Sequence, residues 1–405
     1  MRVKRPTLLM ACVLTAACGS AEDGGRRFAV VDSAGVEIVE SARPAWDSGR
    51  AWRMSDEPTL SIGARKGKAP YLFNGVVSAR RLGDGRIVIA DRGSSQLRFF
   101  DPAGRFLSSA GGAGGGPGEL TYIMRLWTLP GDTLAVSDNR GLSLFDPQGA
   151  YIRSLGHLGA QAAWQGQPVG QLDDGTILAQ GGSGFTPRPG EVIPTTVRLL
   201  RAPPGDSARE LRTIPQARIW GFQMANFNSA MPRGIPFSSA PAFAASGEHF
   251  YVADGPDPEV RVWRGDGSLR RIVRWSMAPR TVGQDLVERY REHLAGSTDD
   301  PEARRRNDAF LAEVQLPERV PATDGGAMLV DGEGNLWVPA YALPWEEASA
   351  WDVFSQEGQW LGPVSMPPRF TPWQIGRDFV IGRWQDELDV EYVLVYELVK
   401  PALRS

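Results

Sequence analysis

A tandem repeat of short apolar runs, separated by turn residues, restricts the fold more than any other feature of this sequence. In the first copy, Val76–Gly118, runs at Arg86–Ala90 and Leu97–Phe100 lead through a turn into a third run, Arg105–Ser108. The second copy aligns closely with it, FDPAGRFLSSAG against FDPQGAYIRSLG, and the pattern continues with variations to the C-terminus. Three β-runs in each of several tandem copies predict a multi-bladed array of β-sheets.

Six copies can be followed, beginning at about residues 76, 122, 167, 239, 324 and 370. The sixth copy has no outer strand after Val390–Leu398. A propeller has to close its ring, because an open end leaves edge strands and an apolar blade face in water. Thr59–Ile62 has the pattern of an outer strand, so we expect it to complete the sixth blade. The predicted fold is an all-β, six-bladed β-propeller closed by an N-terminal strand.

A helical insertion at about 281–315 is predicted between blades four and five. Thr281 and Gln284 resemble a capping box, which marks the start of a helix. Asp300-Pro301 has the preferred order of an N-cap and a first helical residue, so a second helix should begin there. Apolar residues recur at every fourth position of the first helix, which predicts one packed face: Val282, Leu286, Tyr290 and Leu294.

The N-terminus has the pattern of an export signal. Basic residues precede an apolar run, Leu8–Leu14, that is too short to cross a membrane. Small residues then lead to Cys18, as in bacterial lipoprotein signals, where the cysteine carries the lipid; ordinary cleavage after Ala17 is the alternative. We predict a signal peptide at 1–17, a lipidated tether at 18–27 and the propeller at 28–400. The protein would then lie in the bacterial cell envelope, on the outer side of the cytoplasmic membrane, in the outer membrane or at the cell surface.

Composition narrows the class of function. The net charge of −3 argues against a strongly basic nucleic-acid surface. The three histidines are too scattered along the chain to suggest a His-rich metal site. Cys12 and Cys18 are the only cysteines. Because Cys12 would leave with the signal and Cys18 would carry lipid, the mature domain is expected to hold no disulfide.

The segment Gly111–Leu120, together with IVIAD and LRFFDPAGRFL, resembles the NHL-type repeat of six-bladed β-propellers. The C-terminal segments Trp351–Phe354, Gly358–Gly362 and Asp386–Tyr392 are similar to the last blades of bacterial six-bladed propeller lipoproteins of the NHL-like or TolB-like kind. The resemblance covers nearly all of Thr59–Val399. It implies a fold and export, and it implies little about chemistry, because fold alone does not settle function.

Three aspartates end the same run of their copies: Asp91, Asp138 and Asp254. One interpretation is an acidic collar that binds Ca²⁺ or another divalent cation near the channel mouth. The other, which recurrence in a repeat favours, is that each aspartate accepts hydrogen bonds from its own loop. Some propellers with six blades are metal-dependent lactonases, so a metal-dependent hydrolase is the alternative function. Further donors of the right type are Asn74, Glu119, Asn139, Asn226, Asn228 and Asn335.

No set of catalytic residues stands out, so we expect a non-catalytic binding or scaffold module without a cofactor. Loops on a rigid scaffold usually carry binding residues, and the candidate ligand contacts lie in loops: Trp220, Asn226, Asn228 and Trp345. Packing of these tryptophans against the helical insertion is the alternative. The expected partner is an envelope protein, peptide or glycan, with the membrane contacted only through the lipid anchor and no nucleic acid bound.

Overall fold

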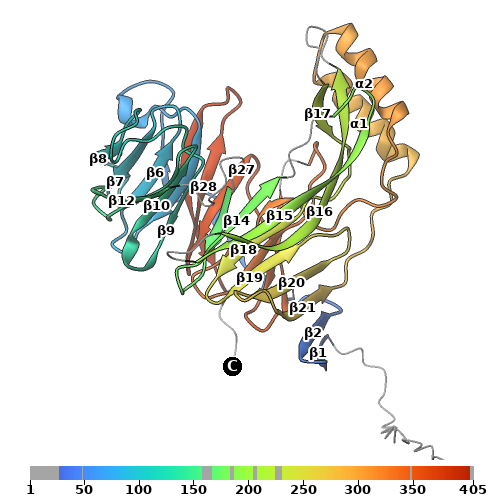
Figure 1. Cartoon of the computed structure of the whole chain (residues 1–405), viewed down its shortest axis with the longest axis horizontal. Coiled ribbons are helices and arrows are strands. Elements are labelled where there is room, and N and C mark those ends of the chain that lie inside the picture. Colours follow the sequence, from blue (N-terminus) through green and yellow to red (C-terminus); the bar gives the residue numbers. More distant parts are fainter. Residues whose placement is uncertain are drawn as a thin grey trace, which may run out of the picture.

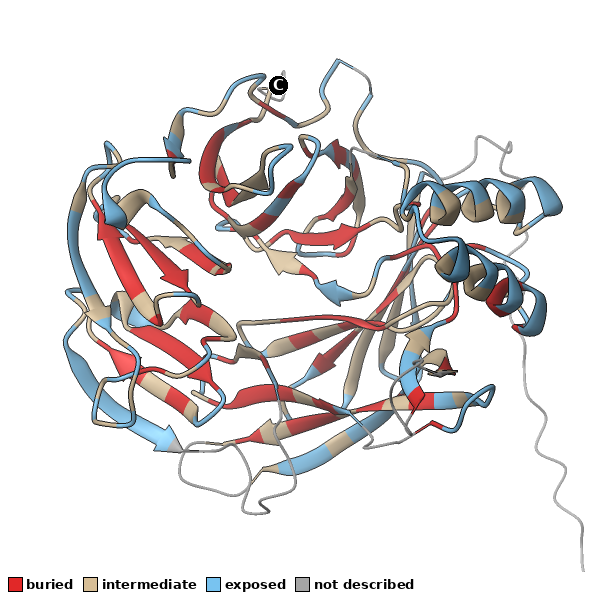
Figure 2. Cartoon of the chain, turned by 90° about the horizontal axis from the view of Figure 1, so that it is seen from above, coloured by how far each residue is buried: buried red, intermediate tan, exposed pale blue. Residues whose placement is uncertain are grey.

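The structure, a computed structural model, describes residues 27–47, 49–156, 167–182, 187–203, 208–223, 230–346 and 349–401. The predicted signal, Cys18 and most of the predicted tether lie outside these residues. In the described chain the strands form six sheets around a common centre, and two α-helices lie to one side (Figures 1 and 2). The architecture is an all-β propeller, as the repeats predict.

The first two sheets each contain four antiparallel strands that follow the chain in order. The first sheet consists of β5 (Val76–Arg81), β6 (Ile87–Asp91), β7 (Gln96–Phe100) and β8 (Phe106–Gly111). The second consists of β9 (Arg125–Thr128), β10 (Leu134–Asp138), β11 (Gly141–Phe145) and β12 (Tyr151–Gly156). Each sheet has one strand more than the apolar runs of the repeat, because an innermost strand, β5 or β9, precedes the first run.

The third sheet has five strands and extends beyond the others on one side (Figure 1). It consists of β13 (Gln167–Gln171), β14 (Ile177–Gly182), β15 (Val192–Ala202), β16 (Arg209–Gln223) and β17 (Ala230–Gly234). β15 and β16 form a long hairpin in which Arg201 pairs with Arg209 at one end and Val192 pairs with Trp220 at the other. The region after Ile219, which shows no clear periodicity in the sequence, therefore includes the end of β16 and all of β17.

The fourth sheet combines strands from three parts of the chain. Its central strands are β18 (Ala242–Ser246), β19 (His249–Ala253), β20 (Glu259–Arg264) and β21 (Leu269–Trp275). β22 (Gly326–Ala327) pairs parallel to β18, and the hairpin β1 (Phe28–Ser33) and β2 (Val36–Ser41) joins the outer edge through parallel pairing of β2 with β21. Glu37 on β2 forms ion pairs of 2.6 Å with both Arg270 and Arg271 on β21, which hold the hairpin in register.

The last two sheets bring the two ends of the fold together. The fifth consists of β23 (Leu329–Val330), β24 (Leu336–Pro339), β25 (Ala350–Phe354) and β26 (Trp360–Ser365). The sixth consists of β27 (Phe370–Ile375), β28 (Phe379–Gln385), β29 (Glu391–Val399), β3 (Arg53–Met54) and β4 (Leu60–Ile62). β4 pairs with β29 so that Ile62 faces Val393 and Leu60 faces Val395. The strand expected at Thr59–Ile62 thus pairs with the last repeat, and β3 extends the same edge of β29.

The innermost strands of neighbouring sheets contact one another all the way round. β5 contacts β9 and β27, β13 contacts β18, and β23 contacts β18 and β27. Arg125 joins β9 to β13, because its Nη1 donates hydrogen bonds to the carbonyl oxygens of Pro168 and Val169 at 2.8 and 2.9 Å. The six innermost strands therefore surround a central channel.

The apolar core lies between adjacent sheets. β6 is buried along its whole length because both of its faces are covered, whereas β8 at the rim of the same sheet is mostly exposed. Between the fifth and sixth sheets, Trp337 and Trp351 share a buried cluster with Tyr396. Between the fourth and fifth, the rings of Trp275 and Phe354 lie 4.9 Å apart. Large aromatic rings thus join neighbouring sheets.

The repeated turn before each outer strand has a local cause. Asp101 Oδ1 accepts hydrogen bonds from the backbone N–H groups of Ala103 and Arg105 at 3.0 and 2.8 Å. Asp146 makes the same pair of bonds in the second sheet. The glycine of each turn has a positive φ, +78° at Gly104, which suits a residue without Cβ.

Two helices, α1 (Gln284–Gly296) and α2 (Pro301–Glu313), lie in the chain between β21 and β22. Asp300 caps α2 by accepting a hydrogen bond from the Glu302 N–H at 2.9 Å, as its position predicts. The capping box predicted at Thr281 is wrong: the N-cap of α1 is Gly283, without a side-chain bond. Gln284 is therefore the first helical residue and cannot occupy the third position that a capping box requires. Within the described residues, no helix is long and apolar enough to cross a membrane.

Candidate functional site

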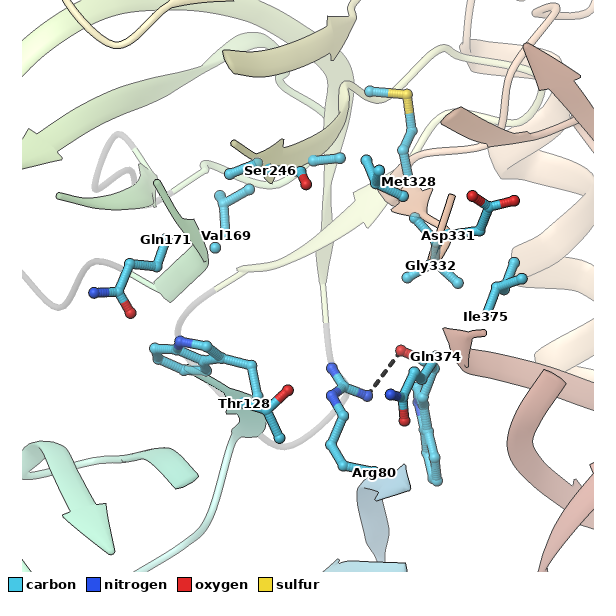
Figure 3. A pocket seen from close by; sticks show the side chains of 17 residues that line it. Arg80, Thr128, Val169, Gln171, Ser246, Met328, Asp331, Gly332, Gln374 and Ile375 are labelled. Carbon is cyan, nitrogen blue, oxygen red and sulfur yellow. Dashed lines mark hydrogen bonds between the residues drawn. The ribbon is translucent and has the colours of Figure 1, made fainter. Parts of the chain in front are cut away.

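The innermost strands end around a cavity of about 390 Å³ at one end of the channel (Figure 3). Every sheet contributes to its lining, through residues at the C-terminal ends of β5, β9, β13, β18 and β27 and around β23. The lining residues that matter below are Arg80, Trp127, Thr128, Ser246, Asp331 and Gln374. Concave sites of this size on a rigid scaffold are typical of small-molecule binding sites.

Two polar side chains of this cavity are held by their own surroundings. Gln374 accepts a hydrogen bond from the Arg81 N–H at 2.7 Å and donates one to the Arg81 carbonyl oxygen at 3.2 Å. Asp331 Oδ2 accepts hydrogen bonds from Asn335 Nδ2 at 2.9 Å and Trp337 Nε1 at 3.1 Å. These contacts fix Gln374 and Asp331 in the wall of the cavity.

Arg80 gives the cavity its charge. Its side chain reaches from β5 to β27, where Nη1 donates a hydrogen bond to the carbonyl oxygen of Trp373 at 2.7 Å (Figure 3). A second bond of 2.9 Å goes to the carbonyl oxygen of Ala79. Burial, and after it the positive charge of Arg125, lowers the pKa of Arg80 to about 9. The guanidinium is therefore still positively charged at neutral pH.

The structure does not bring the three aspartates of the predicted collar together around one point. Asp91 is buried, accepts hydrogen bonds from the Asn74 N–H at 3.0 Å and the Ser94 hydroxyl at 2.7 Å, and forms an ion pair of 2.9 Å with Arg98. Its carboxylate is fully used by the loops at the end of β6. This is the loop-binding role that recurrence in the repeat favours.

The other two aspartates also have local partners. Asp138 accepts hydrogen bonds from the N–H groups of Thr121 and Arg140 at 2.9 and 2.8 Å. Asp254 forms an ion pair of 2.8 Å with Arg261. Over the described parts of the chain, no group of three or more His, Cys, Asp and Glu side chains is arranged to hold a metal ion.

The remaining metal-donor candidates are dispersed. Glu119 accepts a hydrogen bond from the Gly116 N–H at 2.6 Å, inside the glycine-rich turn between the first two sheets. Asn139 accepts one from the Thr121 hydroxyl at 2.6 Å, and Asn335 binds Asp331. Asn226 and Asn228 lie outside the described residues. The described candidates thus stabilise separate loops.

Both candidate tryptophans pack against the helices. The loop position predicted for Trp220 is wrong, because the residue lies in β16, where it pairs with Val192. Trp220 is only 9% exposed, and its ring lies 5.0 Å from that of Phe310 on α2. Trp345 lies 6.1 Å from the ring of His293 on α1, and the Arg289 guanidinium lies 4.9 Å from its centroid. These contacts correspond to the packing alternative for Trp220 and Trp345.

A second cavity, of about 440 Å³, lies between the fifth and sixth sheets at the opposite end of β27. Asp324, Glu346 and Arg369 supply its charged groups. Two of these have partners: Glu346 pairs with Arg280 at 3.2 Å and Arg369 pairs with Asp389 at 3.5 Å. The charges of this cavity are therefore largely balanced within the protein, in contrast to those of the central cavity.

Sequence reasoning did not identify Arg80 or the other residues of the central cavity. They lie on innermost strands, which precede the apolar runs of the repeat. The sequence does contain a feature that could have pointed to Arg80: it follows the largely apolar segment Val76–Ala79 and precedes a Gly-Asp-Gly turn. A charged side chain at such a position has to face either solvent or the channel.

No protein-family model and no curated protein matches this sequence. Solved structures with a similar arrangement include a member of the DUF4221 family from Bacteroides vulgatus, with 8% identity, covering 86% of this chain and 98% of that chain, at a TM-score of 0.49. A gluconolactonase from Xanthomonas campestris has 13% sequence identity, and the match covers 85% of this chain and 100% of that chain at a TM-score of 0.43. Virginiamycin B lyase from Staphylococcus aureus has 10% sequence identity, and the match covers 84% of this chain and 99% of that chain at a TM-score of 0.41. These likenesses carry no argument about ligand or chemistry, and the NHL-type pattern stays a resemblance of sequence.

Proposed function

We propose that this chain is an exported, lipid-anchored, six-bladed β-propeller that binds a small ligand in its central cavity without converting it. The six sheets are the six blades in this proposal, and Cys18 carries the lipid. The observation that supports it is the convergence of all six sheets on one cavity of about 390 Å³. Binding sites on repeat scaffolds are commonly built in this way, from unlike side chains presented by several repeats.

The size of the cavity limits the ligand. A volume of this order accommodates a small molecule, or the end group of an envelope peptide or glycan, and excludes a folded protein. Binding without conversion is favoured over metal-dependent hydrolysis because Asp91, Asp138 and Asp254 are each held by local donors.

Filling the cavity tests the proposal. Ser246 lines the cavity, so Ser246→Trp should occupy it, whereas Ser268→Trp places the same side chain in an exposed turn and serves as the control. The probes are a panel of monosaccharides, dipeptides, lactones and organic acids, with binding followed by saturation-transfer NMR. We expect at least one probe to bind the wild type and the control, and to lose its signal with Ser246→Trp.

Two outcomes would overturn this function. One is binding of every positive probe by Ser246→Trp as strongly as by the wild type. The other is turnover of a lactone that stops on chelation, which would support the metal-dependent hydrolase instead. The anchor is tested separately by Cys18→Ser, which should move the protein from the membrane fraction to the soluble fraction; an unchanged membrane fraction would contradict lipid attachment.

A further inference from the structure

Two arginines of the channel have no acidic partner within the ranges that the structure describes. Arg80 on β5 binds only the carbonyl oxygens of Ala79 and Trp373. Arg125 on β9 binds only those of Pro168 and Val169. Among the residues that the structure describes, neither forms an ion pair with a carboxylate. The backbone carbonyls that they contact are neutral, so neither guanidinium is bonded to a counter-charge in the described part of the chain.

The positive charge of Arg125 acts on Arg80. Burial lowers the pKa of Arg125, and burial together with the charge of Arg125 lowers the pKa of Arg80 to about 9. Charges removed from water are normally paired with an opposite charge, because an unpaired charge in the interior is costly. With a pKa of about 9, Arg80 is charged at neutral pH. An anion held by Arg80 and Arg125 would offset their mutual repulsion and the cost of placing positive charge in the interior.

Both arginines also have unused hydrogen-bond donors. The four bonds made by Arg80 and Arg125 all use Nη1. Nε and Nη2 of each guanidinium have no partner among the described residues. Nε and Nη2 form one edge of the guanidinium, and that edge matches two oxygens of a carboxylate or phosphate group. The charge and the geometry of these donors therefore suit the same class of ligand.

The cavity is lined by Arg80 and lies next to the hydrogen bond of Arg125, which is not itself a lining residue. Val169, which accepts that hydrogen bond, lines the cavity as well. Asp331 is the carboxylate of this cavity, and its oxygens are already bound by the N–H groups of Asn335 and Trp337. Among the described residues, Asp331 forms no ion pair with either arginine, so the place beside their free donors is open to an anion from outside.

We propose that the channel binds a small oxyanion, a carboxylate or phosphate group, between Arg80 and Arg125. This inference rests on the proposed function and names the chemical class of its ligand. The competing explanation is that each arginine only joins neighbouring inner strands, Arg80 from β5 to β27 and Arg125 from β9 to β13. In that case removing an arginine would lower stability and would change no ligand response.

The test uses the purified full chain with inorganic phosphate and succinate as probes, at constant ionic strength with chloride as reference. Binding is measured by calorimetry, and by tryptophan fluorescence, because Trp127 and Trp373 line the cavity. At least one probe should bind saturably. Arg80→Gln and Arg125→Gln should each weaken that binding about tenfold or more, the range expected for a lost charge-assisted hydrogen bond. The probe that responds tells a phosphate ligand from a carboxylate ligand.

Arg81→Gln is the matched control. It neutralises the next residue of the same strand, whose guanidinium lies 4.8 Å from the ring centroid of Phe379. It should bind both probes like the wild type. If either glutamine variant fails to fold, Arg80→Lys and Arg125→Lys replace it; they keep the charge, lose the planar edge and should bind with intermediate affinity.

The inference is overturned if neither probe binds at millimolar concentration, or if the glutamine variants bind as the wild type does. Such a result leaves the proposed function standing when a neutral probe of the panel still binds and is blocked by Ser246→Trp. Conversely, chelator-sensitive turnover of a lactone would refute the proposed function while oxyanion binding at Arg80 and Arg125 persisted. The two failures are therefore distinguishable.

Discussion

Trp360 donates its indole N–H to the carboxylate of Asp352 at 2.9 Å, within the fifth sheet. Asp352 is only 6% exposed, and its carboxylate forms no ion pair among the described residues. Burial raises the pKa of Asp352 to about 6, against the weaker opposing effect of the hydrogen bond from Trp360. The sheet thus contains a carboxylate that is less easily ionised in the folded state than in the unfolded state.

This relationship predicts the pH dependence of stability. From about pH 3.8 to 6 the folded state keeps a proton that the unfolded state has lost, so the free energy of unfolding falls as pH rises through this window. This loss of folding stability is complete above pH 6 and amounts to roughly 3 kcal/mol at most. Asp352→Asn, which keeps an oxygen for Trp360, should remove this slope and raise the free energy of unfolding at pH 7. Urea unfolding at a series of pH values measures both effects.

Asp101→Asn is the control for this prediction. Hydrogen bonds from the Arg105 backbone N–H and side chain hold the pKa of Asp101 below its usual value. Its substitution should therefore lower stability at pH 7, the opposite direction. Equal stability of Asp352→Asn and the wild type across the pH range would contradict the prediction.

Closure of the ring by β4 predicts a large effect from one buried side chain. Ile62 is 1% exposed and faces Val393 on β29, so Ile62→Ala should lower the free energy of unfolding by about 2–5 kcal/mol. Val31 on the N-terminal hairpin is 59% exposed, and Val31→Ala should change the free energy of unfolding by less than about 0.5 kcal/mol. Urea unfolding followed by tryptophan fluorescence compares the two variants.

Removal of all residues before Gly63 should abolish cooperative unfolding, and a sharp transition in that shortened chain would contradict closure of the ring.

The buried pair of Asp91 and Arg98 predicts a structural role for the aspartate. Their side chains are 1% and 9% exposed, so Asp91→Asn should leave Arg98 buried without a counter-charge and cost about 3–5 kcal/mol. Asp254→Asn breaks a more exposed pair, with Arg261, and should cost under about 1 kcal/mol. Thermal unfolding with and without a chelator tests both. A metal collar would instead make the wild type lose stability on chelation and both variants insensitive to it.

The contact of Phe310 with Trp220 predicts that one residue attaches the helices. Phe310 is fully buried, and the Arg233 guanidinium lies 3.9 Å from its ring centroid. Phe310→Ala should release α2 from β16, with a local cost of about 3–5 kcal/mol. Limited proteolysis should then cut near Ser297–Asp300 much faster than in the exposed control Ala309→Ser. Equal cleavage rates would show that other contacts hold the helices.

Much of the fold can be predicted from local signals. The second, third and fourth strands of the first two sheets coincide with apolar runs, and the turn at Asp101 is recognised because its side chain binds its own backbone. The start of α2 at Pro301 is equally local. The pairing of β4 with β29 follows from a different argument, since a propeller that ends without an outer strand needs one from its other end.

The rest depends on tertiary contacts that leave no local signal. The innermost strands carry polar and basic residues, such as Arg80 and Arg125, because one of their faces lines the channel. The N-terminal hairpin pairs with β21, which follows it by more than 200 residues. No local sequence pattern links Glu37 to its partner Arg271 over that separation. The cationic groups of the central cavity therefore have no counterpart among the acidic and amide residues that the repeat pattern brings out.

The pairing of β4 with β29 has a consequence for how the protein is made. The Thr59 hydroxyl donates a hydrogen bond to the carbonyl oxygen of Val395, a residue 336 positions later. When a chain crosses a membrane N-terminus first, β4 emerges long before β29. Until β29 emerges, the edge of this apolar strand is unpaired. Such edges invite association with other chains. Under the proposed export, maturation should therefore depend on holding chaperones outside the membrane, which shield the early segment until the last strand emerges.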